Sequence, residues 1–271
     1  MLVPKHFPIV RLALIAAGLV FAHPSYSDSE AELAKKLANP VAALISVPIQ
    51  ANYDENVGAN EDGSVWRVNI QPVIPFSIGR DWNVISRTIL PLVDQDDVPV
   101  KNRGESGLGD ILQSFFFSPK APTTGGLIWG IGPAILMNTA SEPELGSEKW
   151  ATGPTAVVLK QTGQWTYGLL ANHLESFAGD GDRADISASF FQPFVSYITQ
   201  SKTTLGLNLE STYDWEDNNW SVPINLTVNQ LLGINGQLIQ LGGGIRYWAE
   251  TPDGGPDDWG LRLQVTLLFP K

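Results

Sequence analysis

The stretch TTLGLNLESTYDW at positions 203–215 most constrains what this chain can fold into. In an extended chain, successive side chains point to opposite faces. One face then carries apolar and aromatic groups, and the other carries polar ones. The apolar set is Leu205, Leu207, Leu209, Tyr213 and Trp215, and the polar set includes Asn208, Glu210, Thr212 and Asp214. A strand of this length with two such different faces must separate two different environments.

Similar patterning recurs along most of the chain. It predicts twelve strands, near 42–54, 65–78, 82–92, 107–118, 126–138, 150–161, 165–177, 185–199, 203–215, 220–231, 237–249 and 259–269. The links between them alternate between long and short, and the short ones contain turn formers such as Gly79, Gly163 and Gly233. This form is typical of an all-β, transmembrane, antiparallel up-and-down β-barrel of the outer membrane, with short turns on the periplasmic side.

A secreted β-sandwich is the alternative, because it also alternates apolar and polar positions. Its strands average only about 5–6 residues, shorter than those predicted here. Tryptophan placement also favours the barrel, because aromatic rings prefer the two membrane interfaces. The predicted outer-rim set is Trp66, Trp150, Trp215, Trp220, Trp248 and Trp259, and the periplasmic set is Trp82, Trp129 and Trp165. The strands near 107–118 and 165–177 alternate less cleanly, and their pattern does not orient them.

The N-terminus predicts export. Lys5 and Arg11 precede a short apolar run at 12–22, and small residues follow at 25–27, as in a signal peptide. We expect a signal peptide at 1–27, a short periplasmic segment at 28–41 with a helix at 28–38, and the barrel at 42–271. A retained N-terminal membrane anchor is the alternative.

Charge and composition exclude several classes of protein. The net charge is −11 and Cys is absent, which argues against nucleic-acid partners and excludes thiol catalysis. The long loops hold many acids and few bases, so the outer mouth should favour cations and could hold divalent ions that bridge to lipopolysaccharide; loop solubility explains the same charge. The stretches 178–185 and 251–259 resemble fragments of calcium loops but lack the full ligand spacing, so no metal and no cofactor are predicted.

Charged and polar side chains on the inward faces are the candidate site. The predicted pore-lining residues are Arg67, Asn69, Arg87, Asp110, Asn208, Glu210, Asp214, Arg246 and Arg262. Opposed charges across a lumen can select polar solutes. They can also brace a filled, closed barrel with ion pairs. A twelve-stranded barrel is wider than the eight-stranded size that side chains fill, which favours an open pore.

An enzyme is the less favoured interpretation, and we expect no catalysis. His173 is the only histidine after the predicted signal peptide, with Ser176 and Glu175 close by in sequence. Because His173 and Ser176 are three residues apart on a strand, they point to opposite faces. The chain has no Gly-x-Ser-x-Gly elbow and no His-Glu-x-x-His motif.

Several segments together resemble a known family, among them NIQPVIPFSIG, DWNVISRTILPL, GESGLGDILQSFFFSPK, STYDWEDNNWSVPINL and RYWAETPDGGPDDWGLRLQVTLLFPK. They are similar to bacterial outer-membrane transporters of the MetA-pathway phenol-degradation family, some of which carry the label neuromedin U. The resemblance implies an outer-membrane barrel that transports small aromatic or hydrophobic compounds. The sequence departs from the usual barrel-assembly signal, because Phe269 is followed by Pro270 and Lys271.

Together these patterns predict a channel or transporter for small solutes in the outer membrane. Its expected partners are outer-membrane lipid, lipopolysaccharide, a small-molecule solute and the barrel assembly machinery during export. A lipid-modifying hydrolase and a closed structural or adhesin barrel are the alternatives that stay open.

Overall fold

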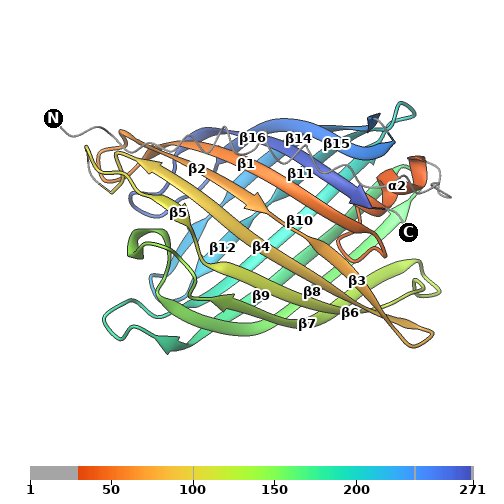
Figure 1. The fold of residues 1–271 in the computed structure, drawn as a ribbon, viewed down its shortest axis with the longest axis horizontal. Helices are drawn as coiled ribbons and strands as arrows, with labels where there is room; N and C mark the ends of the chain where they lie inside the picture. The colour runs from red at the N-terminus through yellow and green to blue at the C-terminus, as the bar shows by residue number, and fades with distance from the viewer. Residues whose placement is uncertain (1–29, 100, 235, 270–271) are drawn as a thin grey trace.

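The computed structural model describes residues 30–99, 101–234 and 236–269. They form a closed antiparallel barrel with a short helix at one end, α2 (Glu30–Leu37) (Figure 1). The sheet segments are β1 (Ile45–Val57), β2 (Gly63–Ile70), β3 (Val73–Ile78), β4 (Trp82–Asp96), β5 (Ser106–Leu108), β6 (Ile111–Pro119), β7 (Leu127–Met137), β8 (Lys149–Thr162), β9 (Trp165–Gly179), β10 (Ser187–Ile198), β11 (Thr203–Leu209), β12 (Ser211–Asp214), β13 (Asn219–Ser221), β14 (Pro223–Ile234), β15 (Gln237–Trp248) and β16 (Asp258–Phe269). A 3-10 helix at Pro143–Leu145 lies in one of the loops.

These sixteen segments make up twelve barrel strands, because four of the strands are each divided into two segments by a short irregularity. The interrupted pairs are β2 with β3, β5 with β6, β11 with β12, and β13 with β14. The barrel closes where β1 pairs antiparallel with β16, from Ile45 opposite Phe269 to Asp54 opposite Gly260. The predicted fold class, an up-and-down barrel of twelve strands, is confirmed.

The two faces of the strands divide as the alternation predicted. Leu205 and Leu207 on β11 are 43% and 40% exposed on the outer surface, and Leu261 and Leu263 on β16 are 55% and 59% exposed. Their neighbours in sequence, such as Arg262, point inward and are buried. The apolar face is therefore the outer one, which in a membrane would face lipid.

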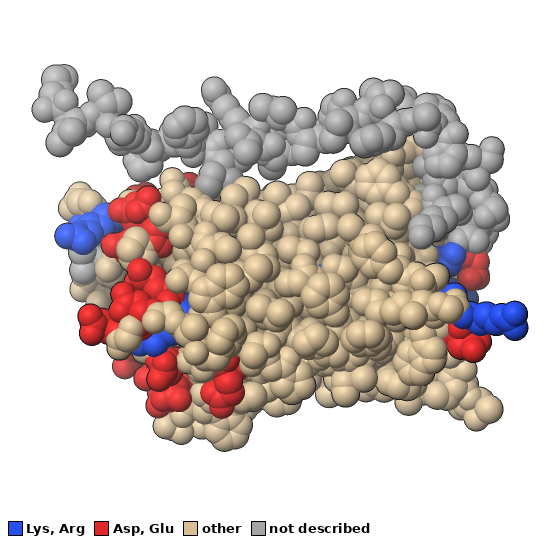
Figure 2. Space-filling model, turned by 60° about the horizontal axis from the view of Figure 1, so that its bottom comes forward, with Lys and Arg blue, Asp and Glu red and all other residues tan. Residues whose placement is uncertain are grey.

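The two ends of the barrel differ. Long loops rich in Asp and Glu cover one end, and short turns join the strands at the other (Figure 1, Figure 2). Aromatic pairs mark both rims: Tyr53 with Trp66 at the acidic end, and Trp82 with Trp129 at the short-turn end. By analogy with the predicted topology, the acidic end is named the extracellular end and the short-turn end the periplasmic end.

Trp248 is a correction to the predicted outer belt. Its side chain lies inside the barrel and is 8% exposed, because strand register turns it inward beside Asp54. Its indole Nε1 donates a hydrogen bond to Asp54 Oδ1 at 2.8 Å. A polar partner inside the barrel thus fixes this tryptophan away from the membrane interface.

The residues that precede the barrel enter its periplasmic end. In α2, Leu33 and Ala34 are fully buried and belong to one cluster with inward-facing side chains of four strands: Ile198, Leu231, Leu238 and Leu268. Gln161 Nε2 also donates to the carbonyl of Lys35 at 2.9 Å. The first strand begins at Ile45, three residues later than predicted, because Val41, Ala42 and Leu44 are buried in the same interior.

The predicted signal peptide at 1–27 lies outside the described residues. No helix in the described ranges is both long and apolar enough to cross a membrane.

Candidate functional site: a lumen with two unlike walls

An ion pair between Arg262 and Glu210 lies inside the barrel. Arg262 comes from β16, and Glu210 lies at the break between β11 and β12. The pair is bidentate, with Arg262 Nη1 at 2.9 Å from Glu210 Oε1 and Nη2 at 2.8 Å from Oε2. Arg262 Nε also donates to Asn52 Oδ1 at 2.8 Å. The guanidinium is 3% exposed, so this geometry holds it in one position.

A second charged group lies toward the extracellular end. Arg246 Nη1 is 3.5 Å from Asp54 Oδ2, and its guanidinium lies 4.5 Å above the Trp248 ring. Both charged side chains are about one-tenth exposed or less. The cation–π contact and the ion pair together offset the desolvation of Arg246.

Arg87 and Arg67 supply positive charge without an ion pair among the described residues. Arg87 Nη2 donates to the amide oxygen of Gln71 at 2.9 Å, and Arg67 is exposed to the lumen opposite Asn52. In the middle of the described lumen, four arginines therefore share two carboxylates, Asp54 and Glu210. The mid-lumen has a surplus of positive charge, unlike the acidic rim.

The opposite wall of the lumen is apolar, which the sequence did not predict. Inward-facing side chains of β4 to β10 gather there with Val41 of the N-terminal segment. They include Ile85, Phe116, Val157, Leu159, Leu170, Phe190 and Phe194. The strands near 107–118 and 165–177 could not be oriented from their patterning because they carry apolar groups on both faces. The apolar side chains on the outer face suit contact with lipid. Those on the inner face form the apolar wall of the lumen.

A cavity of about 260 Å³ lies between the two walls. Its lining includes the polar side chains of Arg87, Gln192 and Glu210 and the apolar side chains of Leu170 and Phe194. Ala34 and residues 36–40 of the N-terminal segment also line this cavity. The segment therefore bounds it on the periplasmic side. A solute here would meet a charged surface and an apolar surface at the same time.

Of the remaining predicted pore-lining residues, two lie in the lumen and two hold loops or turns. Asn69 faces the lumen on β2, and Asn208 accepts a hydrogen bond from Asn225 Nδ2 at 3.0 Å. Asp110 instead braces a loop at the extracellular end, where its two oxygens accept from the backbone N–H groups of Thr139, Ala140 and Ser147 and from the Ser147 hydroxyl. Asp214 accepts from two backbone N–H groups of the turn that follows β12.

His173 lies outside the lumen. Its predicted neighbour Ser176 points the other way, and the Ser176 hydroxyl donates to Asp185 at 3.2 Å. The serine next to His173 is Ser189 on the adjacent strand, with Oγ 2.9 Å from His173 Nδ1. Only strand register, which sequence proximity does not reveal, could have identified that neighbour.

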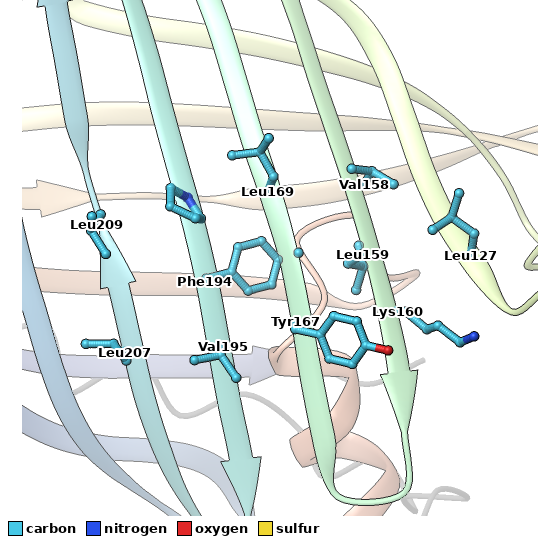
Figure 3. A pocket seen from close by; sticks show the side chains of 12 residues that line it. Leu127, Val158, Leu159, Lys160, Tyr167, Leu169, Phe194, Val195, Leu207 and Leu209 are labelled. Atoms are coloured by element: carbon cyan, nitrogen blue, oxygen red, sulfur yellow. The ribbon is translucent and has the colours of Figure 1, made fainter.

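An apolar groove of about 530 Å³ runs along the outer face of β8 to β11. Figure 3 shows Leu169, Val195 and Leu207 among its lining side chains. A Cβ on Gly168 would lie 2.7 Å from Phe194 Cζ, which is too close. Glycine at this position therefore makes room for the Phe194 ring. Phe194 lines both the groove and the lumen cavity, so the wall is thin at this point.

In the described ranges, no three His, Asp or Glu side chains gather closely enough to hold a metal ion. In the stretch 178–185, Asp180 Oδ1 accepts from the Asp182 backbone N–H at 2.9 Å, which is turn chemistry.

The fold can be compared with solved structures. The COG4313 outer membrane channel from Pseudomonas putida F1 superposes with a TM-score of 0.65 at 14% identity, covering 84% of this chain and 96% of that one. The fold is that of an outer-membrane barrel. The NanC porin superposes with a TM-score of 0.50 at 11% identity, over 82% of this chain and 98% of the porin.

No family model and no curated protein sequence matches the chain. Membership of the MetA-pathway phenol-degradation family therefore stays a prediction.

Proposed function

We propose that this protein is an outer-membrane channel for small solutes that combine an apolar body with a polar or anionic group. Small aromatic or hydrophobic compounds are the solute class that fits. The observation that carries the proposal is the two-walled lumen, where Arg87 and Phe194 line one cavity of about 260 Å³. This volume lies just below the usual range for drug-sized ligands, so the solutes should be small.

The outer apolar surface supports the proposed location in the outer membrane, with lipid and lipopolysaccharide around the barrel. Export by the predicted signal peptide and insertion by the barrel assembly machinery belong to the same proposal. The N-terminal segment fits a periplasmic gate, since it lines the cavity and buries Leu33 and Ala34 against four strands. Displacement of this segment would open a path to the periplasm.

The test is solute flux through the purified full-length protein in liposomes. We expect uptake of benzoate to exceed uptake of acetate at the same low concentration, although acetate is smaller. Replacement of Phe194 by Asn should remove this preference, while Phe177→Asn on the outer surface serves as the matched control. Flux that follows solute size alone would contradict the amphipathic selectivity. An absence of flux and of conductance, also after residues 30–40 are deleted, would favour the closed structural or adhesin barrel.

A further inference from the structure

Ser189, His173 and Glu175 form a line of side chains on the outer face of the barrel. Ser189 and His173 are directly opposed on β10 and β9, so their side chains share a face. Glu175 lies two residues after His173 and shares it as well. His173 Nδ1 is 2.9 Å from Ser189 Oγ, and His173 Nε2 is 3.5 Å from Glu175 Oε1. A hydroxyl, an imidazole and a carboxylate therefore follow one another in the order used to activate a serine.

The hydrogen bonds around this group are compatible with a serine that donates to the imidazole. Trp215 Nε1 donates to Ser189 Oγ at 3.0 Å, and an indole nitrogen can only donate. The Ser189 proton stays available for His173 Nδ1. In the tautomer that accepts it, the imidazole carries its own proton on Nε2, toward the Glu175 carboxylate. The Ser187 hydroxyl donates to Glu175 Oε1 at 3.2 Å and helps to hold the carboxylate.

A second polar group on the outer face provides a contrast. Gln113 Nε2 donates to Ser86 Oγ at 3.0 Å, and Thr88 Oγ1 donates to Gln113 Oε1 at 2.6 Å. In that cluster the side-chain amide and hydroxyl groups bond to one another and to the backbone carbonyls of Arg87 and Ser114. The Ser189 group differs because it contains an imidazole, His173, and a carboxylate, Glu175, next to that imidazole. Neither group is needed merely to give the Ser189 hydroxyl a hydrogen-bond partner.

The surroundings of the group match a membrane interface. Phe177 and Trp215 are 63% and 54% exposed on the outer surface, while Ser189 is only 8% exposed. An incoming ester must therefore displace the Trp215 indole from Ser189 Oγ. A Trp215 N–H that stayed beside Ser189 would then be able to donate to the attacked carbonyl oxygen, where a donor stabilises developing negative charge.

The apolar groove described above starts on the same face of the same two strands. Ser189, Phe191, Pro193 and Val195 alternate along β10 on the outer side, and Pro193 and Val195 line the groove. Leu169, also in the groove, is four residues from His173, roughly 13 Å at ~3.3 Å per residue. An acyl chain with its ester at Ser189 could extend along the groove toward the middle of the membrane.

We propose that Ser189 is the nucleophile of a serine esterase that takes carboxylic esters of aliphatic acyl chains from the outer leaflet. Ser189 Oγ adds to the ester carbonyl carbon while its proton passes to His173 Nδ1. The tetrahedral intermediate collapses, the C–O bond to the alcohol breaks, and His173 returns the proton to the leaving alkoxide. Water, deprotonated by His173, then attacks the acyl-serine; the C–O bond to Ser189 breaks, His173 returns the proton to Ser189 Oγ, and the carboxylic acid leaves. Glu175 is a positioning residue for the imidazole.

The test combines labelling and turnover by the full-length protein in detergent micelles. A fluorophosphonate probe should label the wild type, with the adduct mapped by mass spectrometry to Ser189, and p-nitrophenyl octanoate should be hydrolysed. Ser189→Ala should abolish both, and His173→Gln should lower the hydrolysis rate about 100-fold or more. Ser176→Ala, on the other face of the wall, is the matched control and should behave as wild type.

Two further variants separate the roles. Trp215→Phe should lower kcat about 100-fold, the usual effect of an oxyanion donor, while the barrel stays folded by its heat-modifiable migration on gels. Glu175→Gln should lower kcat with KM unchanged, a split that a purely structural role would not produce. A wild type that is neither labelled nor active above Ser189→Ala, or an adduct on another serine, would overturn the proposal.

Discussion

Glu210 neutralises a guanidinium that has almost no access to solvent. Replacement of Glu210 by Gln would leave Arg262, 3% exposed, without its bidentate carboxylate. Loss of one partner of a buried pair costs about 3–5 kcal/mol in the free energy of unfolding. We expect a decrease of this size in urea unfolding in lipid, followed by tryptophan fluorescence. Glu216→Gln, in an exposed turn, should leave the unfolding midpoint unchanged; an equal decrease for both variants would show that the pair is not responsible.

Arg87 should set the ionic preference of the lumen. Its guanidinium lines the cavity and is bonded to the neutral Gln71. A unit charge about 4 Å from a passing ion in water contributes about 1 kcal/mol, equal to about fivefold in permeability. Arg87→Gln should therefore lower the anion-to-cation permeability ratio by about this factor, measured as the reversal potential across a KCl gradient. Arg80→Gln in a periplasmic turn should not change this ratio. An unchanged ratio for Arg87→Gln would show that Arg87 does not determine the ionic preference.

The ion pair of Lys149 with Asp185 predicts a pH dependence at the extracellular rim. Lys149 Nζ lies 2.8 Å from Asp185 Oδ1, and its hydrogen bond holds the pKa of this carboxyl below the ordinary value of 3.8. Because the folded-state pKa is depressed, the stabilisation is complete above pH 3.8 and is lost as the pH falls through the folded value. Asp185→Asn should make the bond after Arg183 more sensitive to trypsin at about pH 7.5, where the carboxylate is ionised. Its thermal unfolding should differ from wild type near neutral pH, and the difference should shrink as the pH falls below about 3.8; a constant difference would contradict the assignment.

At the scale of elements, α2 is the part of the fold that should control conduction. Leu33 is fully buried against side chains of β10, β14, β15 and β16, which are Ile198, Leu231, Leu238 and Leu268. Leu33→Asp would place a carboxylate without a partner in this apolar cluster, which is costly, so α2 should leave it. We expect a higher single-channel conductance in planar bilayers for Leu33→Asp and for deletion of residues 30–40.

The control for this prediction is Lys35→Ala, a change at a partly exposed side chain of the same helix. It should not alter the conductance, because it leaves the buried face of α2 intact. Equal conductance for the wild type, Leu33→Asp and the deletion would show that α2 does not limit the pore.

The strands were predictable from sequence because lipid imposes period-two patterning on one face of each. Where the inner face is polar, as with Asn208 and Glu210 on the stretch 203–215, the predicted orientation is also correct. Where the inner face is apolar, as around Phe116 and Leu170, the alternation disappears and orientation is lost. The patterning therefore indicated inward polar side chains of the lumen and missed the apolar ones, and the role of the predicted residues in selecting solutes stays a prediction.

Pairings between distant residues were the other part that sequence could not supply. Asp110 and Glu210 are both inward-strand acids by pattern, yet Asp110 holds a loop and Glu210 holds Arg262. The neighbour of His173 depends in the same way on the register between β9 and β10, which places Ser189 opposite it. Register is set by the whole sheet, and a single strand does not encode it.

At the scale of the whole molecule, the rim and the lumen carry opposite charge. Acidic side chains gather at the extracellular end (Figure 2). In the described lumen, by contrast, arginines exceed carboxylates. Exposed rim charges are screened when the Debye length falls from about 10 Å at ~0.1 M to about 3 Å at ~1 M salt. The anion-to-cation permeability ratio should therefore increase between about 0.1 M and 1 M KCl, measured from reversal potentials at a fixed concentration ratio. A ratio that is constant or that decreases would show that the rim does not act on passing ions.

The contacts of α2 also impose an order in time on the formation of the molecule. Leu33 belongs to the part of the chain that is made before any strand, yet its cluster includes Leu268 on β16, the last strand. Because β16 must first pair with β1 to close the sheet, α2 can reach its final position only after β16 has reached its own. Packing of α2 at the periplasmic end would thus occur only in a complete barrel, and an unfinished barrel would stay open at that end.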